Sequence, residues 1–170
     1  EARISAMVGV PALWQLLERK ITAQIKDRGP AVEAMFDMAL TLNRLLGEKV
    51  GADVGRVLFG QVHNALGGRL KYLISGGAAL PKDTAKLFAS MGLHLSEGYG
   101  LTEAAPVLTV SKAAPGAKLG NVGKPIPGVQ VKILNPDPSG VGEVLARGPN
   151  VMQGYADDPE STAKTVDAEG

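Results

Sequence analysis

The chain has 170 residues, of which 45% are hydrophobic and 21% are charged, and its formal net charge is +1 at pH 7. This composition is typical of a globular domain, and the near-neutral charge argues against a nucleic-acid-binding protein, which would be strongly basic. The absence of cysteine excludes a disulfide framework, a thiolate metal site and a cysteine nucleophile.

The first fifty residues predict a short strand followed by two helices. An apolar run over residues 4–10 is typical of a buried strand. Pro11 suits the first turn of a helix, and Gly29-Pro30 ends that helix. We assign Trp14 and the pair Met35 and Met38 to the core or to packing, rather than to a site. The apolar stripe of the second helix consists of Val32, Met35, Ala39, Leu42 and Leu46.

A strand, a loop, a helix and a second strand follow in succession. Residues 54–66 predict a third helix, and residues 70–74 predict a strand. Residues 81–91 then predict a helix, and residues 93–95 predict another strand. This order describes a βαβ unit, which implies a mainly parallel sheet flanked by helices.

The composition of the sequence changes after Pro106, because most of the prolines follow that residue. They separate two short β-branched runs, 129–133 and 143–146, and the segment 135–140 between the runs predicts a hairpin turn. We therefore expect an α/β subdomain over residues 1–105. A small β-rich, barrel-like subdomain, truncated at its C-terminal end, is expected over residues 106–170.

Two loops follow the carboxyl ends of predicted parallel strands, at the sheet edge where ligands bind in open α/β folds. In the loop Ser75–Ala79, Gly76 and Gly77 allow the backbone to turn sharply close to a flat ligand. An ordinary turn is the structural alternative. The presence of a second special loop some twenty residues later, on the same sheet edge, favours a binding site.

The second loop, Glu97–Glu103, carries the chemistry of a nucleotide and phosphate site. Gly98 and Gly100 bracket Tyr99, whose ring offers a surface for stacking a purine. The hydroxyl of Thr102 and the N–H groups near it suit a phosphate, and Glu103 supplies a hard carboxylate suited to Mg²⁺. A packed aromatic residue and a helix cap are the alternatives for this loop taken alone.

Other site types find less support. The sequence has neither a G-x-x-x-x-G-K-[ST] phosphate loop nor a G-x-G-x-x-G fingerprint. His63 and His94 lack the spacing of metal ligands, so we assign both histidines structural roles.

The segment Tyr99-Gly-Leu-Thr-Glu103 resembles the adenine-and-magnesium motif of the adenylate-forming superfamily. That superfamily contains acyl-CoA synthetases, luciferases and peptide-synthetase adenylation domains. Residues 75–81 resemble its adenine-side loop, and residues 10–14, with the two helices that follow, look like long-chain fatty acyl-CoA synthetases. Three more segments fit in order and at suitable spacing, namely 120–128, 142–148 and 152–155.

The resemblance implies that a longer parent protein uses ATP, Mg²⁺ and CoA to convert a long-chain fatty acid to acyl-adenylate and then to acyl-CoA. Carried over position by position, it implies an adenine-side loop, a nucleotide-holding segment, a phosphate contact and a metal ligand. These are Gly76, Gly77 and Ala78 for the loop; Glu97, Gly98 and Tyr99 for the nucleotide; Thr102 for phosphate; and Glu103 for Mg²⁺, with Thr102 and Glu103 as the catalytic pair.

The same resemblance assigns the phosphate loop, the ribose-binding aspartate and the adenylation lysine to regions outside this sequence. We therefore expect a central fragment of the large N-terminal domain that is inactive alone. Its expected partners are the small-molecule substrates and the remaining parts of the parent, without nucleic acid. The expected location is the cytoplasm, with peripheral membrane association left open. The alternatives are a peptide-synthetase or aryl-acid adenylating domain, and a non-catalytic nucleotide-binding module.

Overall fold

The computed structural model describes residues 4–167, which divide into two compact units. The first unit runs to Glu97 and includes Ser111–Val122. The second consists of Gly98–Val110 and the chain from Gly123 onward. Strand β3 (Leu95–Tyr99) carries the chain from the first unit into the second. The division expected from the sequence, at residue 106, stays a prediction.

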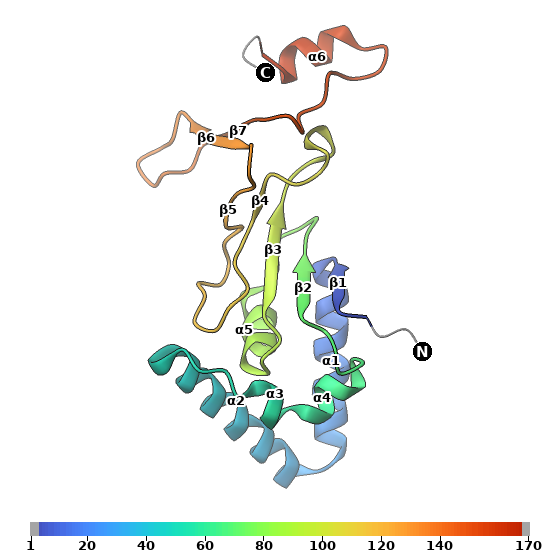
Figure 1. The fold of residues 1–170 in the computed structure, drawn as a ribbon, viewed down its shortest axis with the longest axis vertical. Coiled ribbons are helices and arrows are strands. Elements are labelled where there is room, and N and C mark those ends of the chain that lie inside the picture. Colours follow the sequence, from blue (N-terminus) through green and yellow to red (C-terminus); the bar gives the residue numbers. More distant parts are fainter. Residues whose placement is uncertain (1–3, 168–170) are drawn as a thin grey trace. The chain divides into compact units, whose positions relative to one another are not determined.

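The first unit is built on paired parallel strands that are connected along the chain by helices (Figure 1). Its elements besides β3 are β1 (Ala6–Gly9), α1 (Pro11–Asp27), α2 (Pro30–Val50), α3 (Gly55–Leu58), α4 (Gly60–Ala65), β2 (Tyr72–Ser75) and α5 (Lys82–Ser90). Strand β1 pairs with β2, and β2 pairs with β3, in both cases in parallel. Parallel neighbours need crossover connections, and the helices provide them.

Proline and glycine set the ends of the two long helices. Pro11 and Pro30 lie in the first turns of α1 and α2, where the missing N–H costs no hydrogen bond. Helix α2 ends at Gly51, whose φ of 67° is the left-handed conformation that glycine adopts at helix ends. The two helices predicted over this region are confirmed. Within residues 4–167, no helix combines the length and hydropathy of a transmembrane span.

The core of the first unit lies between the helices and one face of the parallel strands. Trp14 on α1 and Phe88 on α5 are fully buried, and their rings meet edge to face with centroids 6.0 Å apart. Such aromatic pairs add about 0.5–1.5 kcal/mol beyond the burial of their area. Leu73 and Leu95 close the core from neighbouring strands. The assignment of Trp14 to the core is confirmed.

The predicted stripe of helix α2 meets the core only in part: Ala39 packs against the core, whereas Met35 and Leu42 are exposed. Phe36 and Leu40 pack against the core, and Asn43 is buried with its amide satisfied by three hydrogen bonds. Met35 and Met38 are 66% and 68% exposed, so their assignment to the core is wrong. The buried position is occupied by a polar residue, which a pattern of hydrophobic residues cannot reveal.

Two further elements differ from the sequence prediction. The helix expected over residues 54–66 is divided into α3 and α4 at Phe59, which is buried and packs edge to face on Phe36. The strand expected over residues 93–95 begins only at Leu95 and continues to Tyr99. Its last residues pair with a later strand, a partner that local sequence does not indicate.

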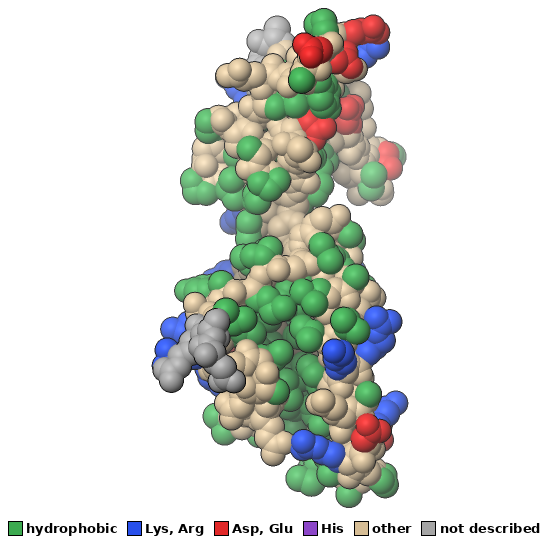
Figure 2. All heavy atoms as spheres, turned by 90° about the vertical axis from the view of Figure 1, so that its right-hand side faces the viewer, with side chains coloured by type: hydrophobic (Ala, Val, Ile, Leu, Met, Phe, Trp, Pro, Cys, Tyr) green, Lys and Arg blue, Asp and Glu red, His purple; other side chains and the backbone are tan. Residues whose placement is uncertain are grey.

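The other face of the parallel strands is largely bare within the first unit. Val8 on β1 and Tyr72 on β2 are 71% and 64% exposed. Figure 2, which views this unit from the β1 edge of the sheet, shows further hydrophobic side chains on that side. Parallel sheets are usually covered on both faces, so the exposed face of β1 and β2 departs from the usual arrangement.

The second unit consists of short antiparallel strands around a small cluster of buried side chains. Its elements after β3 are the 3-10 helix η1 (Thr102–Ala104), β4 (Thr109–Val110), β5 (Lys124–Pro125), β6 (Gln130–Leu134), β7 (Glu143–Arg147) and α6 (Pro159–Thr165). β4 pairs with β3 and β5, and β6 pairs with β7. The predicted turn is confirmed, because the Asp137 carboxylate accepts the backbone N–H groups of Ser139 and Val141 between β6 and β7. The expected α/β fold with an antiparallel unit after it is also confirmed.

Candidate functional site

The adenine-side loop begins where β2 ends. The Gly76 N–H donates to the Gly9 carbonyl at 3.1 Å, which continues the pairing of β1 with β2 by one residue. Gly77 then adopts a φ of 81°, a left-handed conformation that turns the chain away from the sheet. Ala78 is exposed, and Leu80 is buried in the core. The loop is therefore a turn at the sheet edge that is anchored on both sides.

Glu97 lies beside this loop, because it pairs with Ser75 in the register of β2 and β3. Its carboxylate Oε1 accepts the Gly120 N–H at 3.2 Å, and its own N–H donates to Ser111 Oγ at 2.7 Å. The residue is 9% exposed. The first unit thus brings Glu97 next to the start of Gly76–Ala78, and its polar atoms also fasten the segment 111–122.

The predicted residues Gly98, Tyr99, Thr102 and Glu103 belong to the second unit. Gly98 is paired with β4, and the Tyr99 ring packs on the small core cluster of Ala104, Leu108 and Val129. Thr102 is exposed at the start of η1. Gly77 belongs to the first unit and Tyr99 to the second. The expectation that the two residues lie side by side therefore stays a prediction.

The glycine between Tyr99 and the helix η1 is fixed by a close backbone approach. A Cβ added to Gly100 would lie 1.7 Å from the Pro106 carbonyl oxygen, far inside contact distance. No other residue fits there unless the loop shifts. This approach folds the end of the loop back on itself and defines the position of Glu103 three residues later.

Glu103 is held at both its side chain and its backbone. The Tyr155 hydroxyl donates to Glu103 Oε1 at 2.8 Å, and the Met152 N–H donates to the Glu103 carbonyl at 2.7 Å. Asn150 Nδ2 donates to the carbonyls of Ala104 and Val107, at 2.8 and 3.0 Å. The segment 150–155 therefore fastens the segment 103–107.

Sequence reasoning noticed the motif at residues 152–155 but gave Tyr155 no role, and it did not single out Asn150. Both residues lie about fifty positions from the groups that they bind, so no local pattern indicates these contacts. The one signal in the sequence was that segments 99–103 and 152–155 both resemble motifs of the adenylate-forming superfamily.

The contact between Tyr155 and Glu103 shifts both titrations. The hydrogen bond from Tyr155 lowers the pKa of Glu103, and the same bond raises the pKa of Tyr155. Glu103 is accordingly an ionised carboxylate at neutral pH, and Tyr155 is a neutral donor.

This donor set fits Mg²⁺ that is bound together with phosphates. Among the described residues, no three Asp, Glu or His side chains converge as an all-protein metal site. Mg²⁺ is usually held by one or two carboxylates plus substrate phosphates and water, rather than by a protein cage. The single carboxylate of Glu103 is compatible with that mode of binding.

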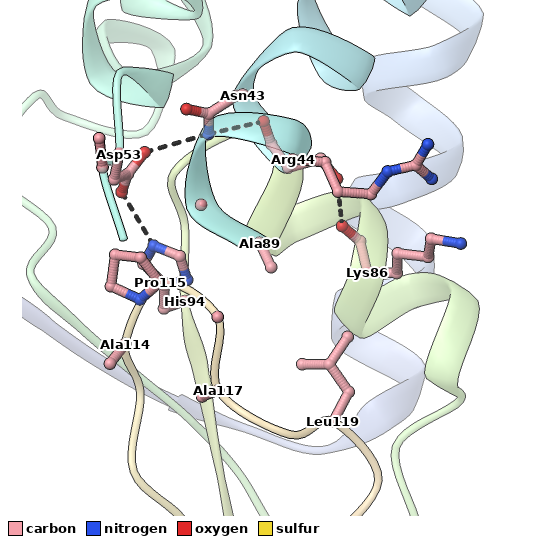
Figure 3. Close-up of a pocket in the computed structure, with 14 residues that line it drawn as sticks. Asn43, Arg44, Asp53, Lys86, Ala89, His94, Ala114, Pro115, Ala117 and Leu119 are labelled. Carbon is pink, nitrogen blue, oxygen red and sulfur yellow. Dashed lines mark hydrogen bonds and ion pairs between the residues drawn. The ribbon is translucent and has the colours of Figure 1, made fainter. Parts of the chain in front are cut away.

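A cavity of about 280 Å³ lies elsewhere in the first unit, near the start of β3 (Figure 3). His94 Nε2 and Asp53 Oδ2 are 2.8 Å apart on its wall, and Asn43 donates to Asp53 Oδ1 at 3.0 Å. Burial raises the pKa of Asp53, but hydrogen bonds from Gly55, His94 and Asn43 outweigh it and lower the pKa overall.

These polar groups connect the end of α2 to the chain before β3. The structural assignment of His94 stays a prediction, because this residue also lines the cavity. That of His63 is confirmed, because its Nε2 lies 2.9 Å from the Met91 carbonyl oxygen in the core. Within the first unit, the residues that line this cavity include neither Glu97 nor the loop Gly76–Ala78.

Comparison with known proteins decides the family. The sequence profile of the AMP-binding enzyme family matches residues 1–156. The chain belongs to the AMP-binding enzyme family. Two relatives cover its whole length: a Mycobacterium tuberculosis protein named as a fatty-acid–CoA ligase (fadD11), 38% identical, and long-chain-fatty-acid–CoA ligase 2 of Schizosaccharomyces pombe, 32% identical. The chain spans only 31% and 26% of those two proteins.

Solved structures of AMP-binding enzymes agree with this assignment. A malonyl-CoA ligase, in a ternary product complex with methylmalonyl-CoA and AMP, matches with a TM-score of 0.54 and 31% identity. The match covers 76% of this chain and 27% of that one. The predicted resemblance of this chain to adenylate-forming enzymes, and among them to fatty-acid–CoA ligases, is confirmed.

Proposed function

We propose that the full-length protein containing this chain activates a long-chain fatty acid with ATP and transfers the acyl group to CoA. The observation that carries the proposal is the match to fatty-acid–CoA ligases along the entire chain. The fixed carboxylate of Glu103 within the loop 99–103 supports it, because this is the residue type that the first step requires.

In the first step, a carboxylate oxygen of the fatty acid attacks the α-phosphorus of ATP and the bond to pyrophosphate breaks. A fatty carboxylate is already ionised at neutral pH, so this step needs no general base. The main obstacle is the approach of an anion to a triphosphate, and charge neutralisation and alignment address it. In the second step, the CoA sulfur attacks the acyl carbon, AMP leaves, and the thiol proton is released.

The residues of this chain would share the first step as follows. The turn Gly76–Ala78 lets the backbone approach the adenine, and Tyr99 offers its ring to the nucleotide. The Thr102 hydroxyl, exposed at the start of η1, is available as a donor to phosphate. Glu103 would hold Mg²⁺, which when bound neutralises phosphate charge.

By itself the 170-residue chain is proposed to be inactive. Adenylation depends on phosphates, metal and carboxylate held in one geometry, and a misplacement of ~1 Å can cost ~100-fold in rate. The chain spans less than a third of each of the two fatty-acid–CoA ligases described above. The same resemblance assigns the phosphate loop and the adenylation lysine to other parts of the parent.

Pyrophosphate exchange by the full-length protein, with a panel of carboxylic acids, tests the proposal. Palmitate is expected to support faster exchange than acetate, benzoate or any amino acid. A preference for benzoate or an amino acid would assign the protein to the aryl-acid or peptide-synthetase group. No exchange with any acid would leave a nucleotide-binding module without adenylation activity.

A further inference from the structure

We propose that Tyr155 is a positioning residue for the metal-binding carboxylate: its hydroxyl fixes the orientation of Glu103 toward the Mg²⁺ of bound ATP. This inference rests on the proposed function, in which Glu103 holds Mg²⁺. It assigns a role to a residue that touches neither metal nor nucleotide. The evidence is the donor geometry, the way in which Tyr155 is itself held, and the backbone contacts beside it.

The hydrogen bond has the geometry of an orienting contact. Tyr155 Oη lies 2.8 Å from Glu103 Oε1, a normal length for a hydroxyl that donates to a carboxylate. A carboxylate has about four lone-pair directions, so one donor leaves acceptor capacity for a metal. The contact therefore fixes the side chain without consuming its ability to bind a cation.

Glu103 needs such a contact because its side chain is not packed in a core. It is half-buried, whereas the next residue, Ala104, is 2% exposed and belongs to the small core cluster. The core thus fixes the backbone of η1 but not the carboxylate. Ligating carboxylates are commonly oriented by an outer hydrogen bond, whose loss typically lowers metal affinity 10–100-fold.

Tyr155 is in turn held by its own surroundings. Its N–H donates to Thr162 Oγ1 at 2.9 Å, and Asp158 caps α6 by accepting the Ser161 N–H at 2.9 Å. A Cβ on Gly154 would lie 2.7 Å from Thr162 Cγ2, so the chain approaches α6 closely just before Tyr155. The phenol is presented from a turn whose backbone is fixed by α6.

A backbone hydrogen bond also connects the two segments that carry Glu103 and Tyr155. Met152 N–H donates to the Glu103 carbonyl, so the two segments are bonded at the main chain as well as through the side chains. Removing the phenol hydroxyl alone should therefore leave the segments attached. This separates a positioning role from a structural one.

The test is calorimetry on the full-length protein, without fatty acid, so that no turnover occurs. Mg·ATP is titrated into the wild type and Tyr155→Phe, and then metal-free ATP is titrated in EDTA. We expect Tyr155→Phe to weaken Mg·ATP binding about tenfold and to leave metal-free ATP binding unchanged. The matched control is Tyr72→Phe, which removes the hydroxyl of an exposed tyrosine on β2 and should change neither value.

Two outcomes would overturn the inference: equal weakening of both forms of ATP, which indicates a structural role, and no effect on either form. A Glu103→Gln variant separates this inference from the proposed function. If Glu103→Gln leaves Mg·ATP binding unchanged, the metal ligand in the proposed function is wrong. If it weakens Mg·ATP binding but Tyr155→Phe does not, the role of Tyr155 alone is wrong. Adding Tyr155→Phe to Glu103→Gln should cause little further loss.

Discussion

The two predicted loops are held in place by different means. The loop Gly76–Ala78 in the first unit continues a strand and is anchored by the neighbouring β1 and by Leu80 in the core. The loop that ends at Glu103 in the second unit is fixed by side chains of Asn150 and Tyr155 from far along the sequence. A loop of the first kind depends on the core beneath it, whereas one of the second kind depends on a few polar contacts.

The largest expected effect is a loss of stability when the core beneath the loop Gly76–Ala78 is disrupted. Trp14→Ala removes a fully buried side chain that packs on Phe88, and should lower the free energy of unfolding by about 4 kcal/mol. Urea denaturation of the 170-residue chain, followed by circular dichroism, measures it.

The control for this variant is Leu16→Ala on the same helix, where the side chain is 42% exposed. It should change stability by no more than about 0.5 kcal/mol. Similar losses for Trp14→Ala and Leu16→Ala would show that the core of the first unit is not arranged as described.

The second prediction concerns the loop that ends at Glu103, where a substitution should reduce activity without unfolding the protein. Glu103→Gln removes the charge but keeps an oxygen that can still accept the Tyr155 hydroxyl. In the full-length protein it should slow adenylation by an amount equivalent to about 3 kcal/mol, because one electrostatic stabiliser is lost. Pyrophosphate exchange measures that step. Thiolation of supplied acyl-adenylate should suffer less, and equal damage to both steps would point to misfolding.

The smallest effect tests the polar support of the second loop. Asn150→Ala leaves the carbonyls of Ala104 and Val107 without their side-chain donor, which should cost about 1–2 kcal/mol of stability. Denaturation of the same chain measures the loss. Gln153→Ala removes an exposed amide three residues later and serves as the control. If both variants behaved alike, Asn150 would not support the loop.

The sequence predicted well whatever depends on local pattern. Pro11 opened a helix and Gly29-Pro30 ended it as expected, the turn around Asp137 formed, and Trp14 is buried. Each of these follows from backbone geometry or from a single strongly hydrophobic side chain. The candidate residues of the two loops also came from the sequence, although their functional roles stay predictions.

What the sequence could not show depends on partners distant along the chain. Asn43 occupies a core position of α2 because three groups from two distant segments satisfy its amide, and the predicted stripe that included Met35 is only partly buried. The contacts of Asn150 and Tyr155 join segments about fifty residues apart in the same way. A hydrogen bond across such a distance leaves no periodicity to detect.

The bare side of the parallel sheet has a consequence for the colloidal behaviour of the chain. Among residues 4–167, strand β1 is at the edge of the sheet and one side of its backbone has no strand partner, and its exposed Val8 offers an apolar contact. Edges of this kind are templates for pairing with another molecule, and the run from Ile4 to Val10 carries no charge that would oppose it. Concentrated solutions of the isolated chain should therefore tend to form strand-paired aggregates, starting at β1.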